Sequence, residues 1–168
     1  MGTIEVRRAE ERDLSACLAM FEELNRLQGP WRLFSPRPGI QEEMARSYRA
    51  ALEEPDAVLV VVEDGGDLVG MAAGHVHRPS TFSEQRAVEL SSVYVRPSHR
   101  RRGLARTLTA EVARFARRRG VERVTLRTFA QNEEAVEAWR RIGFEPRALQ
   151  MTAPPERLIE MNSSARQA

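Results

Sequence analysis

The chain has 168 residues, of which 42% are hydrophobic and 30% charged, as is typical of one soluble globular domain. Its single cysteine, Cys17, has no partner within the chain, which excludes a disulfide scaffold and favours a reducing compartment, the cytoplasm. The longest apolar run, residues 57–62, is too short for a membrane span. All 26 basic residues are arginine, and the net charge of +2 hides their uneven distribution, since 11 of them lie within residues 96–127.

The first third of the chain predicts a strand followed by two helices. Residues 3–8 alternate between polar and apolar side chains in the manner of a strand. Asp13 is suited to cap a helix that ends at Gly29. A second helix, with apolar residues at helical spacing, runs from Ile40 to Pro55.

Strands dominate the middle of the chain. Residues 57–63 and 68–77 flank the glycine-containing turn 64–67, which predicts an antiparallel hairpin. Residues 89–95 form the next predicted strand, and Pro97 ends it because proline brings no N–H group to a ladder.

The last third predicts two helices and two strands. A helix with one apolar stripe ends at Gly120, and residues 122–128 form a strand of alternating apolar and charged residues. A further helix runs from Asn132 to Gly143, which is a suitable C-terminal stop. Residues 144–152 can supply a last strand.

The most informative segment, residues 89–106, places Gly103 between the end of a strand and the start of a helix. The first N–H groups of a helix lack intrahelical partners and carry a partial positive charge, so such a junction can bind phosphate. Gly103 has no Cβ that would hold a ligand away from the backbone, and the neighbouring arginines add counter-charge. The G-x-G-x-x-G fingerprint and the Walker lysine are both absent, so neither of those phosphate sites is expected.

Two spaced motifs carry a resemblance to a known family. The first, R-x-x-G-x-A over residues 100–105, resembles the Q/R-x-x-G-x-G/A signature with which the GNAT superfamily of N-acetyltransferases binds acyl-CoA. The second, residues 132–144, is similar to the helix N-x-x-A-x-x-x-Y-x-x-x-G-F that follows in the family, except that Trp139 stands at the tyrosine position. The order of the predicted elements over residues 3–152 agrees with the same family.

The resemblance implies an α/β fold of the GNAT type. Its central sheet is expected to be mixed and mostly antiparallel, with six to seven strands, a splay between strands 4 and 5, and about four flanking helices. The expected boundaries are a single acetyltransferase domain over residues 1–153 and a polar C-terminal tail over residues 154–168.

The resemblance also implies acetyl-CoA as the co-substrate. The pantetheine arm is expected to pair with the backbone of Val93, Tyr94 and Val95, like an added strand. The amides of residues 101–106 would hold the pyrophosphate, and Asn132 and Ala135 would contact the pantetheine, although Asn132 also suits an ordinary N-cap. The expected cofactor-binding residues are Val93, Tyr94, Val95, Arg101, Arg102, Gly103, Leu104, Ala105, Arg106, Asn132 and Ala135.

The expected reaction is transfer of the acetyl group to a primary amine by direct attack in a ternary complex. This needs a base for the amine proton, and Glu89 matches the position of the catalytic glutamate in the histone-acetylating branch. The alternative for Glu89 is an ion pair with Arg86 or Arg127. The general acid is unassigned, because an indole cannot replace the tyrosine and Tyr94 could donate only if its side chain faced the cleft.

The remaining candidates for site chemistry are three histidines and the cysteine. His75 and His77 would share one strand face, which could suggest a metal, but no cysteine or second histidine pair completes a site, so no metal is expected and a substrate-facing or core role is favoured. His99 either touches phosphate or faces solvent. Cys17 is expected to be a buried small hydrophobe.

The acceptor is expected to be a small-molecule or peptide amine that binds beneath the first two helices and loop 31–38. Residues 1–95 carry a net negative charge, which favours a cationic amine. Two alternatives remain: a catalytically silent acyl-CoA sensor, which Trp139 permits, and an arginine-rich nucleic-acid-binding module. The second lacks interleaved aromatic residues for base stacking, since Phe115 alone lies between Arg100 and Arg127. No nucleic-acid or membrane partner is therefore expected, and the chain is expected to be a monomer or a homodimer.

Overall fold

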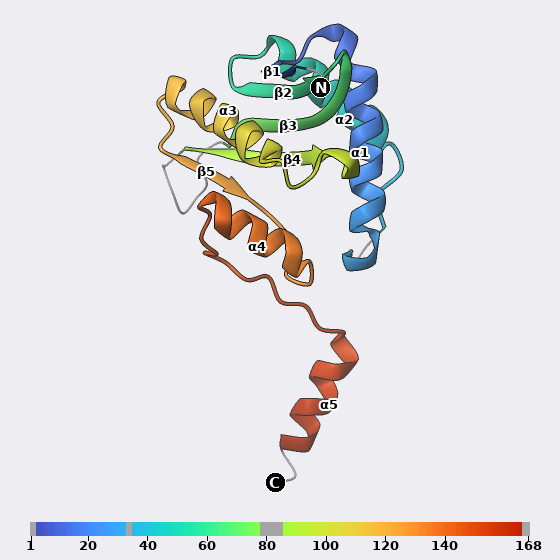
Figure 1. Cartoon of the computed structure of the whole chain (residues 1–168). Coiled ribbons are helices and arrows are strands. Elements are labelled where there is room, and N and C mark those ends of the chain that lie inside the picture. The colour runs from blue at the N-terminus through green and yellow to red at the C-terminus, as the bar shows by residue number, and fades with distance from the viewer. Residues whose placement is uncertain (1–2, 33–34, 78–85, 166–168) are drawn as a thin grey trace. The chain divides into compact units, whose positions relative to one another are not determined.

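The computed structural model describes residues 3–32, 35–77 and 86–165 of the chain (Figure 1). The chain divides into two compact units, residues 1–136 and residues 137–168. The first unit contains the whole described sheet and three complete helices, and the second begins within the fourth helix. The site residues discussed below lie in the first unit unless stated otherwise.

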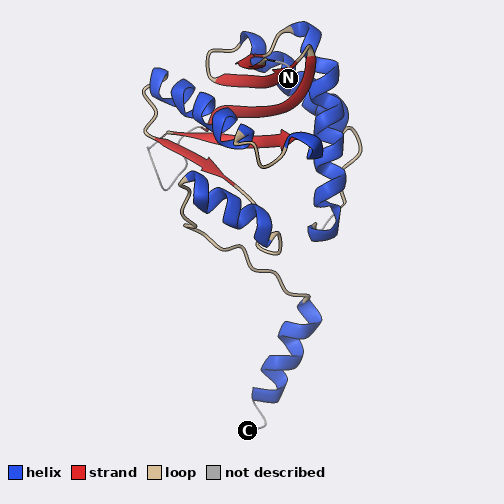
Figure 2. Ribbon diagram, in the orientation of Figure 1, coloured by secondary structure: helices blue, strands red, loops and turns tan. Residues whose placement is uncertain are grey.

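The described residues form one sheet of five strands, which lie in the order in which they occur in the chain (Figure 2). The first three pairings are antiparallel and the fourth is parallel, so the predicted mixed, mostly antiparallel sheet is confirmed. The strands are β1 (Ile4–Arg8), β2 (Ala57–Asp64), β3 (Asp67–His77), β4 (Ala87–Val95) and β5 (Arg123–Leu126).

Helices cover both faces of the sheet in the first unit. The first two helices pack on one face, and the third crosses the other (Figures 1 and 2). None of the described helices is long and apolar enough to cross a membrane. The helices are α1 (Leu14–Gln28), α2 (Ile40–Glu53), α3 (Leu104–Arg118), α4 (Glu133–Ile142) and α5 (Pro155–Ala165).

The core follows from strand alternation. Leu59, Val61 and Met71 point toward α1 and α2, where they join Cys17 and Tyr48 in one buried cluster. Cys17 is fully buried, as expected, and this burial raises the pKa of its thiol to about 12. The cysteine is therefore a packing residue with little thiolate at neutral pH.

A β-bulge in β4 decides which side chains share a face. Ala73 of β3 pairs with Ser92, but the next residue, Gly74, pairs with Leu90, so Ser91 has no partner in the ladder. The extra residue reverses the alternation of β4. As a result Glu89, five positions before Tyr94, lies on the same face as Tyr94, the face that carries α1 and α2.

The predicted number of strands is wrong. Within the described ranges the sheet has five strands where six to seven were expected, and residues 144–152, the expected last strand, have no regular secondary structure. Pro146 brings no N–H group to a ladder, and the apolar side chains of Leu149 and Met151 are 71% and 83% exposed. In the tail, residues Pro155–Ala165 form the helix α5.

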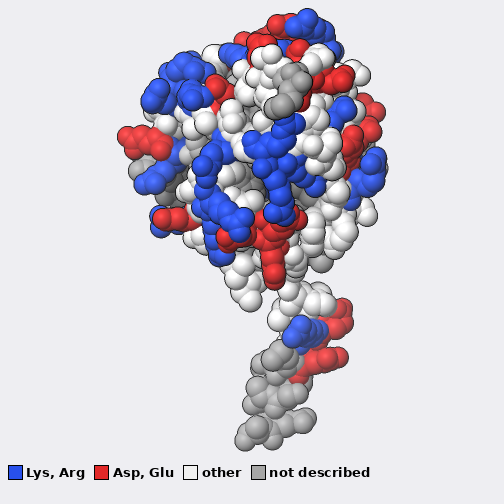
Figure 3. All heavy atoms as spheres, viewed as in Figure 1, with Lys and Arg blue, Asp and Glu red and all other residues white. Residues whose placement is uncertain are grey.

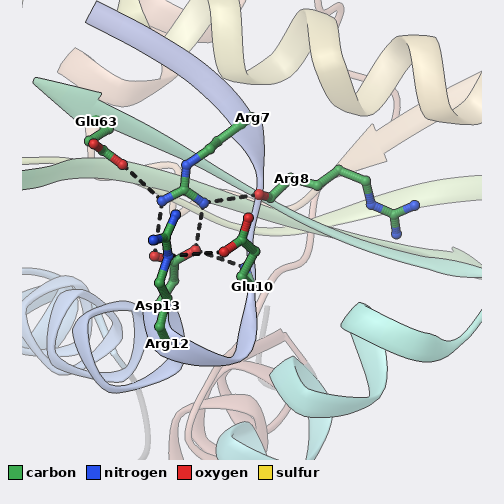
Figure 4. Close-up of polar contacts among 6 residues, drawn as sticks. All are labelled: Arg7, Arg8, Glu10, Arg12, Asp13 and Glu63. Atoms are coloured by element: carbon green, nitrogen blue, oxygen red, sulfur yellow. Dashed lines mark hydrogen bonds and ion pairs between the residues drawn. The ribbon is translucent and has the colours of Figure 1, made fainter. Parts of the chain in front are cut away.

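One ion-pair cluster joins β1, β2 and the start of α1 (Figure 4). The guanidinium of Arg7 donates from Nη1 to Asp13 Oδ2 at 2.6 Å and from Nη2 to Asp13 Oδ1 at 3.1 Å and to Glu63 Oε2 at 2.9 Å. Asp13 Oδ2 also accepts from the backbone N–H of Glu10. Asp13 therefore occupies the N-cap position of α1 without the expected side-chain cap bond, because its carboxylate already serves Arg7 and Glu10.

Gly74 of β3 leaves no room for a side chain beneath α3. A Cβ built there would lie 2.9 Å from Val112 Cγ1 and 3.2 Å from Val88 Cγ1, and both are stiff, buried side chains. We expect Gly74→Ala to lower the free energy of unfolding by about 1–3 kcal/mol through overpacking. Urea titration measures this, with Gly29→Ala as the control, because a Cβ at Gly29 meets nothing within 4 Å and its φ of −47° suits alanine. Equal stability of the two variants would contradict the tight contact.

Candidate active site

The turn before α3 presents a row of backbone N–H groups. Gly103 has a φ of +78°, and Arg101 is the one non-glycine residue in the described ranges with a positive φ, at 59°. The first backbone hydrogen bond of α3 runs from Thr107 N to Gly103 O, so the amides at the start of the helix have no intrahelical partner. Left-handed residues in a turn aim successive amides at one point, and a helix N-terminus adds partial positive charge. The turn has the backbone conformation that the predicted phosphate site needs, and phosphate binding there stays a prediction.

Arg100, the first residue of the motif, ties this turn to the end of β4. Its Nε donates to the carbonyl oxygen of Val95 at 3.0 Å, and its guanidinium carbon lies 5.9 Å from the ring centroid of Tyr94. Both contacts fix the backbone between the strand and the turn. Sequence reasoning used Arg100 only as a motif position and missed this structural role.

Arginines gather on the molecular face seen in Figure 3, with acidic groups between them. Near the turn, Asp64 lies 3.6 Å from the guanidinium of Arg102 and 3.3 Å from His99 Nε2, and Glu134 lies 3.4 Å from Arg101. His99 is therefore beside a carboxylate, a contact that the sequence did not predict. Carboxylates from β2 and α4 therefore neutralise part of the positive charge of the arginines beside the turn.

β4 and β5 separate beside the turn. Their parallel pairing covers Ala87–Leu90 against Arg123–Leu126, and β4 then continues to Val95 with no β5 partner in the described residues. The expected splay is confirmed. The β5-facing edge of Val93, Tyr94 and Val95 thus has no partner strand in the described residues where it approaches the Gly103 turn, and the carbonyl oxygen of Val95 accepts from Arg100.

Glu89 lies on β4 before the splay begins. Its side chain is 19% exposed, and its Oε1 accepts from Arg127 Nη2 at 2.7 Å and Arg127 Nε at 3.2 Å. Its other oxygen, Oε2, faces His75 Nε2 at 4.0 Å. The predicted alternative of an ion pair with Arg127 is therefore present, whereas Arg86 contacts Asp56 instead.

Asn132 acts as the N-cap of α4. Its Oδ1 accepts from the backbone N–H of Ala135 at 3.1 Å, and its own carbonyl accepts from Val136 N. The cap occupies the amide oxygen and leaves the NH₂ group of the side chain for other acceptors. Asn132 and Ala135 are both partly exposed.

Neither aromatic candidate for the general acid is suited to that role. The Tyr94 hydroxyl donates to Glu23 on α1, and burial, followed by this hydrogen bond, raises its pKa. Tyr94 is 3% exposed and belongs to the core cluster, in agreement with the predicted packing role. In the second unit, Trp139 packs edge to face on Phe144, with their ring centroids 5.6 Å apart.

A hollow of about 200 Å³ lies beside the C-terminal half of α1. It lies within the region where the sequence predicts the acceptor, although residues 33 and 34 of the expected loop fall outside the described ranges. Arg32 borders it and donates to the side-chain oxygens of Asn25 and Gln28. The lining residues are Phe21, Asn25, Arg32, Pro36 and Ile40.

Comparison with known proteins identifies the family. Residues 20–144 match the family described as "Acetyltransferase (GNAT) family", which is well over half of the chain. The chain belongs to the GNAT acetyltransferase family. The resemblance that the two motifs carry is thereby confirmed.

Individual GNAT relatives share part of their length with this chain. Streptothricin acetyltransferase of Streptomyces lavendulae is 36% identical over 93 residues, which cover 55% of this chain and 47% of the relative. The uncharacterized N-acetyltransferase YjgM of Escherichia coli strain K12 is 36% identical over 92 residues, covering 55% and 53%. The chain thus spans about half the length of the curated relatives that it matches.

Solved structures share the GNAT fold. The aminoglycoside N-acetyltransferase AAC(6')-Iy in complex with CoA has a TM-score of 0.74 at 17% identity, covering 92% of this chain and 95% of that one. A predicted acetyltransferase from Clostridium acetobutylicum with acetyl-CoA has a TM-score of 0.70 at 17% identity, covering 90% and 96%. At these identities the likeness establishes the fold alone.

Proposed function

We propose that this chain is an acetyl-CoA-dependent N-acetyltransferase that acts on a primary amine of a small molecule or peptide. The observation that carries the proposal is the separation of β4 from β5 directly beside the Gly103 turn. The separation leaves a strand edge without a partner strand for the pantetheine arm, and the start of α3 leaves amides without intrahelical partners for the pyrophosphate. Membership of the GNAT family supports the same activity.

In this proposal the cofactor is held mainly by backbone. Val93, Tyr94 and Val95 pair with the pantetheine, and the amides of residues 101–106 hold the pyrophosphate. The NH₂ group of Asn132 donates to the pantetheine, because the cap bond to Ala135 engages only the side-chain oxygen. Arg101 and Arg102 exchange their contacts with Glu134 and Asp64 for phosphate oxygens, which accept charge-assisted and often bidentate hydrogen bonds from guanidinium groups.

The proposed acceptor is a cationic amine. It enters from the α1 and α2 face, which carries both Glu89 and the hollow beside α1. The names of streptothricin acetyltransferase and of the aminoglycoside acetyltransferases support a small-molecule amine. The net negative charge of residues 1–95 favours an acceptor of the opposite sign.

The proposed reaction is direct attack of the neutral amine on the thioester carbonyl. A nitrogen–carbon bond forms, the carbon–sulfur bond breaks, and the amine proton passes to Glu89 directly or through one water molecule. Arg127 holds Oε1, so Oε2 is the oxygen placed to receive the proton. The departing thiolate takes its proton from water, since the Tyr94 hydroxyl is engaged with Glu23.

The first experiment measures the melting temperature with acetyl-CoA and with short RNA, and then thiol release over a panel of polyamines, aminoglycosides and peptides. We expect acetyl-CoA to raise the melting temperature and at least one amine to release thiol. Stabilisation without turnover would instead support a silent acyl-CoA sensor, which Trp139 at the tyrosine position favours. Stabilisation by RNA but not by acetyl-CoA would overturn the proposal.

Gly103→Val is expected to raise the Kd for CoA at least tenfold, which is about 1.4 kcal/mol. A β-branched residue is strained at a φ of +78°, so the turn must rotate and redirect its amides, or else the new side chain blocks the phosphates. Calorimetric titration with CoA measures the change. The matched control is Gly120→Val, which imposes similar strain at a φ of +65° beyond the other end of α3. Equal loss of CoA affinity in both variants would contradict the phosphate turn.

A further inference from the structure

We infer that His75, His77 and Glu89 form a binding site for one divalent transition-metal ion, with Zn²⁺ as the best-suited ion. Each side chain offers one ligand atom, and these atoms all lie within 4.8 Å of one another. Two imidazoles and one carboxylate are a known zinc donor set, which leaves the fourth position open for water or a substrate group.

The backbone holds the three residues in one place. His75 is directly opposite Glu89 in the ladder between β3 and β4, and His77 follows two positions later on the same face of β3. The bulge at Ser91 creates this register, because without it Glu89 would pair with Val76 and face the other side of the sheet. The three positions are thus fixed by paired strands.

The distances fit a metal after a small movement. Zinc bonds of about 2.0–2.2 Å in a tetrahedron place ligand atoms roughly 3.3–3.6 Å apart. His75 Nε2 and Glu89 Oε2 are 4.0 Å apart, and no two of the three ligand atoms are more than 4.8 Å apart, so side-chain movements of about 1.5 Å or less would bring them to the separation that zinc needs. His75 is 49% exposed and His77 is exposed, so both rings have room to rotate.

The Arg127 ion pair leaves the metal-facing oxygen of Glu89 available. Both guanidinium contacts of Arg127 go to Oε1, whereas Oε2 is the oxygen that faces His75. The positive charge of Arg127 nevertheless opposes a bound cation. Removing that charge should therefore tighten metal binding, an effect that a simple His75–Glu89 ion pair does not predict.

The consequence for catalysis rests on the proposed function. The ion would occupy the same Glu89 oxygen that receives the amine proton, so bound metal would inhibit acetyl transfer reversibly. The metal site itself does not depend on that function, because binding can be measured without substrates.

The experiment uses the full chain without a histidine tag. Co²⁺ is titrated in and followed by its visible d–d absorption, and Zn²⁺ affinity is measured by competition with a chromophoric chelator. We expect one ion per chain, with at least tenfold weaker binding in His75→Gln and in His77→Gln, because even outer-shell partners of a metal contribute that much. We expect Arg127→Gln to bind more tightly than the parent chain.

The control is His99→Gln, which removes the third histidine at its contact with Asp64 and should leave metal binding unchanged. No saturable binding, or binding that survives both His75→Gln and His77→Gln, would overturn the site. If acetyl transfer is observed, Zn²⁺ should inhibit the parent chain and inhibit His77→Gln less, each relative to its own metal-free rate. If no amine is acetylated, the Co²⁺ spectra still decide the metal site.

Discussion

Replacing Glu89 with glutamine is expected to lower kcat for acetyl transfer by about 10²–10⁴-fold and to leave the Kd for acetyl-CoA unchanged. That loss corresponds to about 3–5 kcal/mol of transition-state stabilisation. Glutamine keeps the size of the side chain and can still accept from Arg127, but an amide cannot take up the amine proton. The phosphate turn and the free edge of β4 lie outside the substituted side chain, so cofactor binding should persist.

Thiol release with saturating acceptor measures the rate, and calorimetry with CoA measures binding. The matched control is Glu122→Gln, which makes the same chemical change at an exposed glutamate just before β5 and should retain the parent rate. If Glu89→Gln keeps the parent rate, Glu89 serves only as the partner of Arg127. If the variant loses CoA binding as well as the rate, its defect is not confined to proton transfer.

The elements that the sequence predicts correctly are those with a local signal. The turn 64–67 predicts a hairpin because two glycines can both adopt positive φ, and Gly65 and Gly66 do so at 63° and 95°. The start of α3 follows from Gly103, again through a backbone conformation that only glycine adopts easily. In both places a glycine and its neighbours decide the backbone conformation, so the sequence alone is sufficient to predict the element.

The last predicted strand shows where local patterns fail. Leu149 and Met151 alternate as strand residues do, but alternation gives a strand only where a partner edge accepts it. Residues 144–152 do not pair with any described strand, and Pro146 would weaken a ladder there because proline has no N–H group to donate. A pattern of period two is therefore necessary but not sufficient for a strand.

The site residues divide in the same way. The Gly103 turn and the cap at Asn132 were predictable from motifs, whereas the meeting of His75, His77 and Glu89 was not. That meeting depends on the unpaired Ser91, and a one-residue bulge leaves no clear trace in hydrophobic alternation. The sequence could have suggested the cluster only through an expected cross-strand register, which is a non-local property.

The second large effect concerns stability: Asp13→Asn is expected to lower the free energy of unfolding at neutral pH by about 3–5 kcal/mol. The Asp13 side chain is 6% exposed, and it accepts two hydrogen bonds from Arg7 and one from Glu10 N. Asparagine keeps the shape but leaves the nearly buried guanidinium with Glu63 as its one carboxylate partner in this cluster (Figure 4). Arg7 links β1 to β2 and to the start of α1, so removing the negative charge of Asp13 weakens the contacts among all three elements.

The effect of Asp13→Asn should depend on pH in one direction. The hydrogen bonds from Arg7 lower the pKa of Asp13 below its ordinary value. A carboxyl group whose pKa is lower in the folded state stabilises the fold above its unfolded-state pKa of about 3.9, and the stabilisation is lost as pH falls through the folded-state pKa. Urea titrations should therefore show a large difference in the free energy of unfolding between the parent chain and the variant at a pH of about 7. The difference should be smaller at a pH of about 2.

The matched control is Asp56→Asn, which makes the same substitution at an exposed carboxylate that pairs with two arginines. Asp56 Oδ1 lies 2.8 Å from Arg119 and 3.4 Å from Arg86, but its side chain is 51% exposed. An exposed pair is screened by water and contributes at most about 1 kcal/mol, so this variant should remain close to the parent stability. Equal destabilisation by the two substitutions would show that burial is not what makes the Arg7–Asp13 pair important. A loss at Asp13 alone would mean that the fold depends on this enclosed pair, whereas the exposed arginine pairs contribute little to its stability.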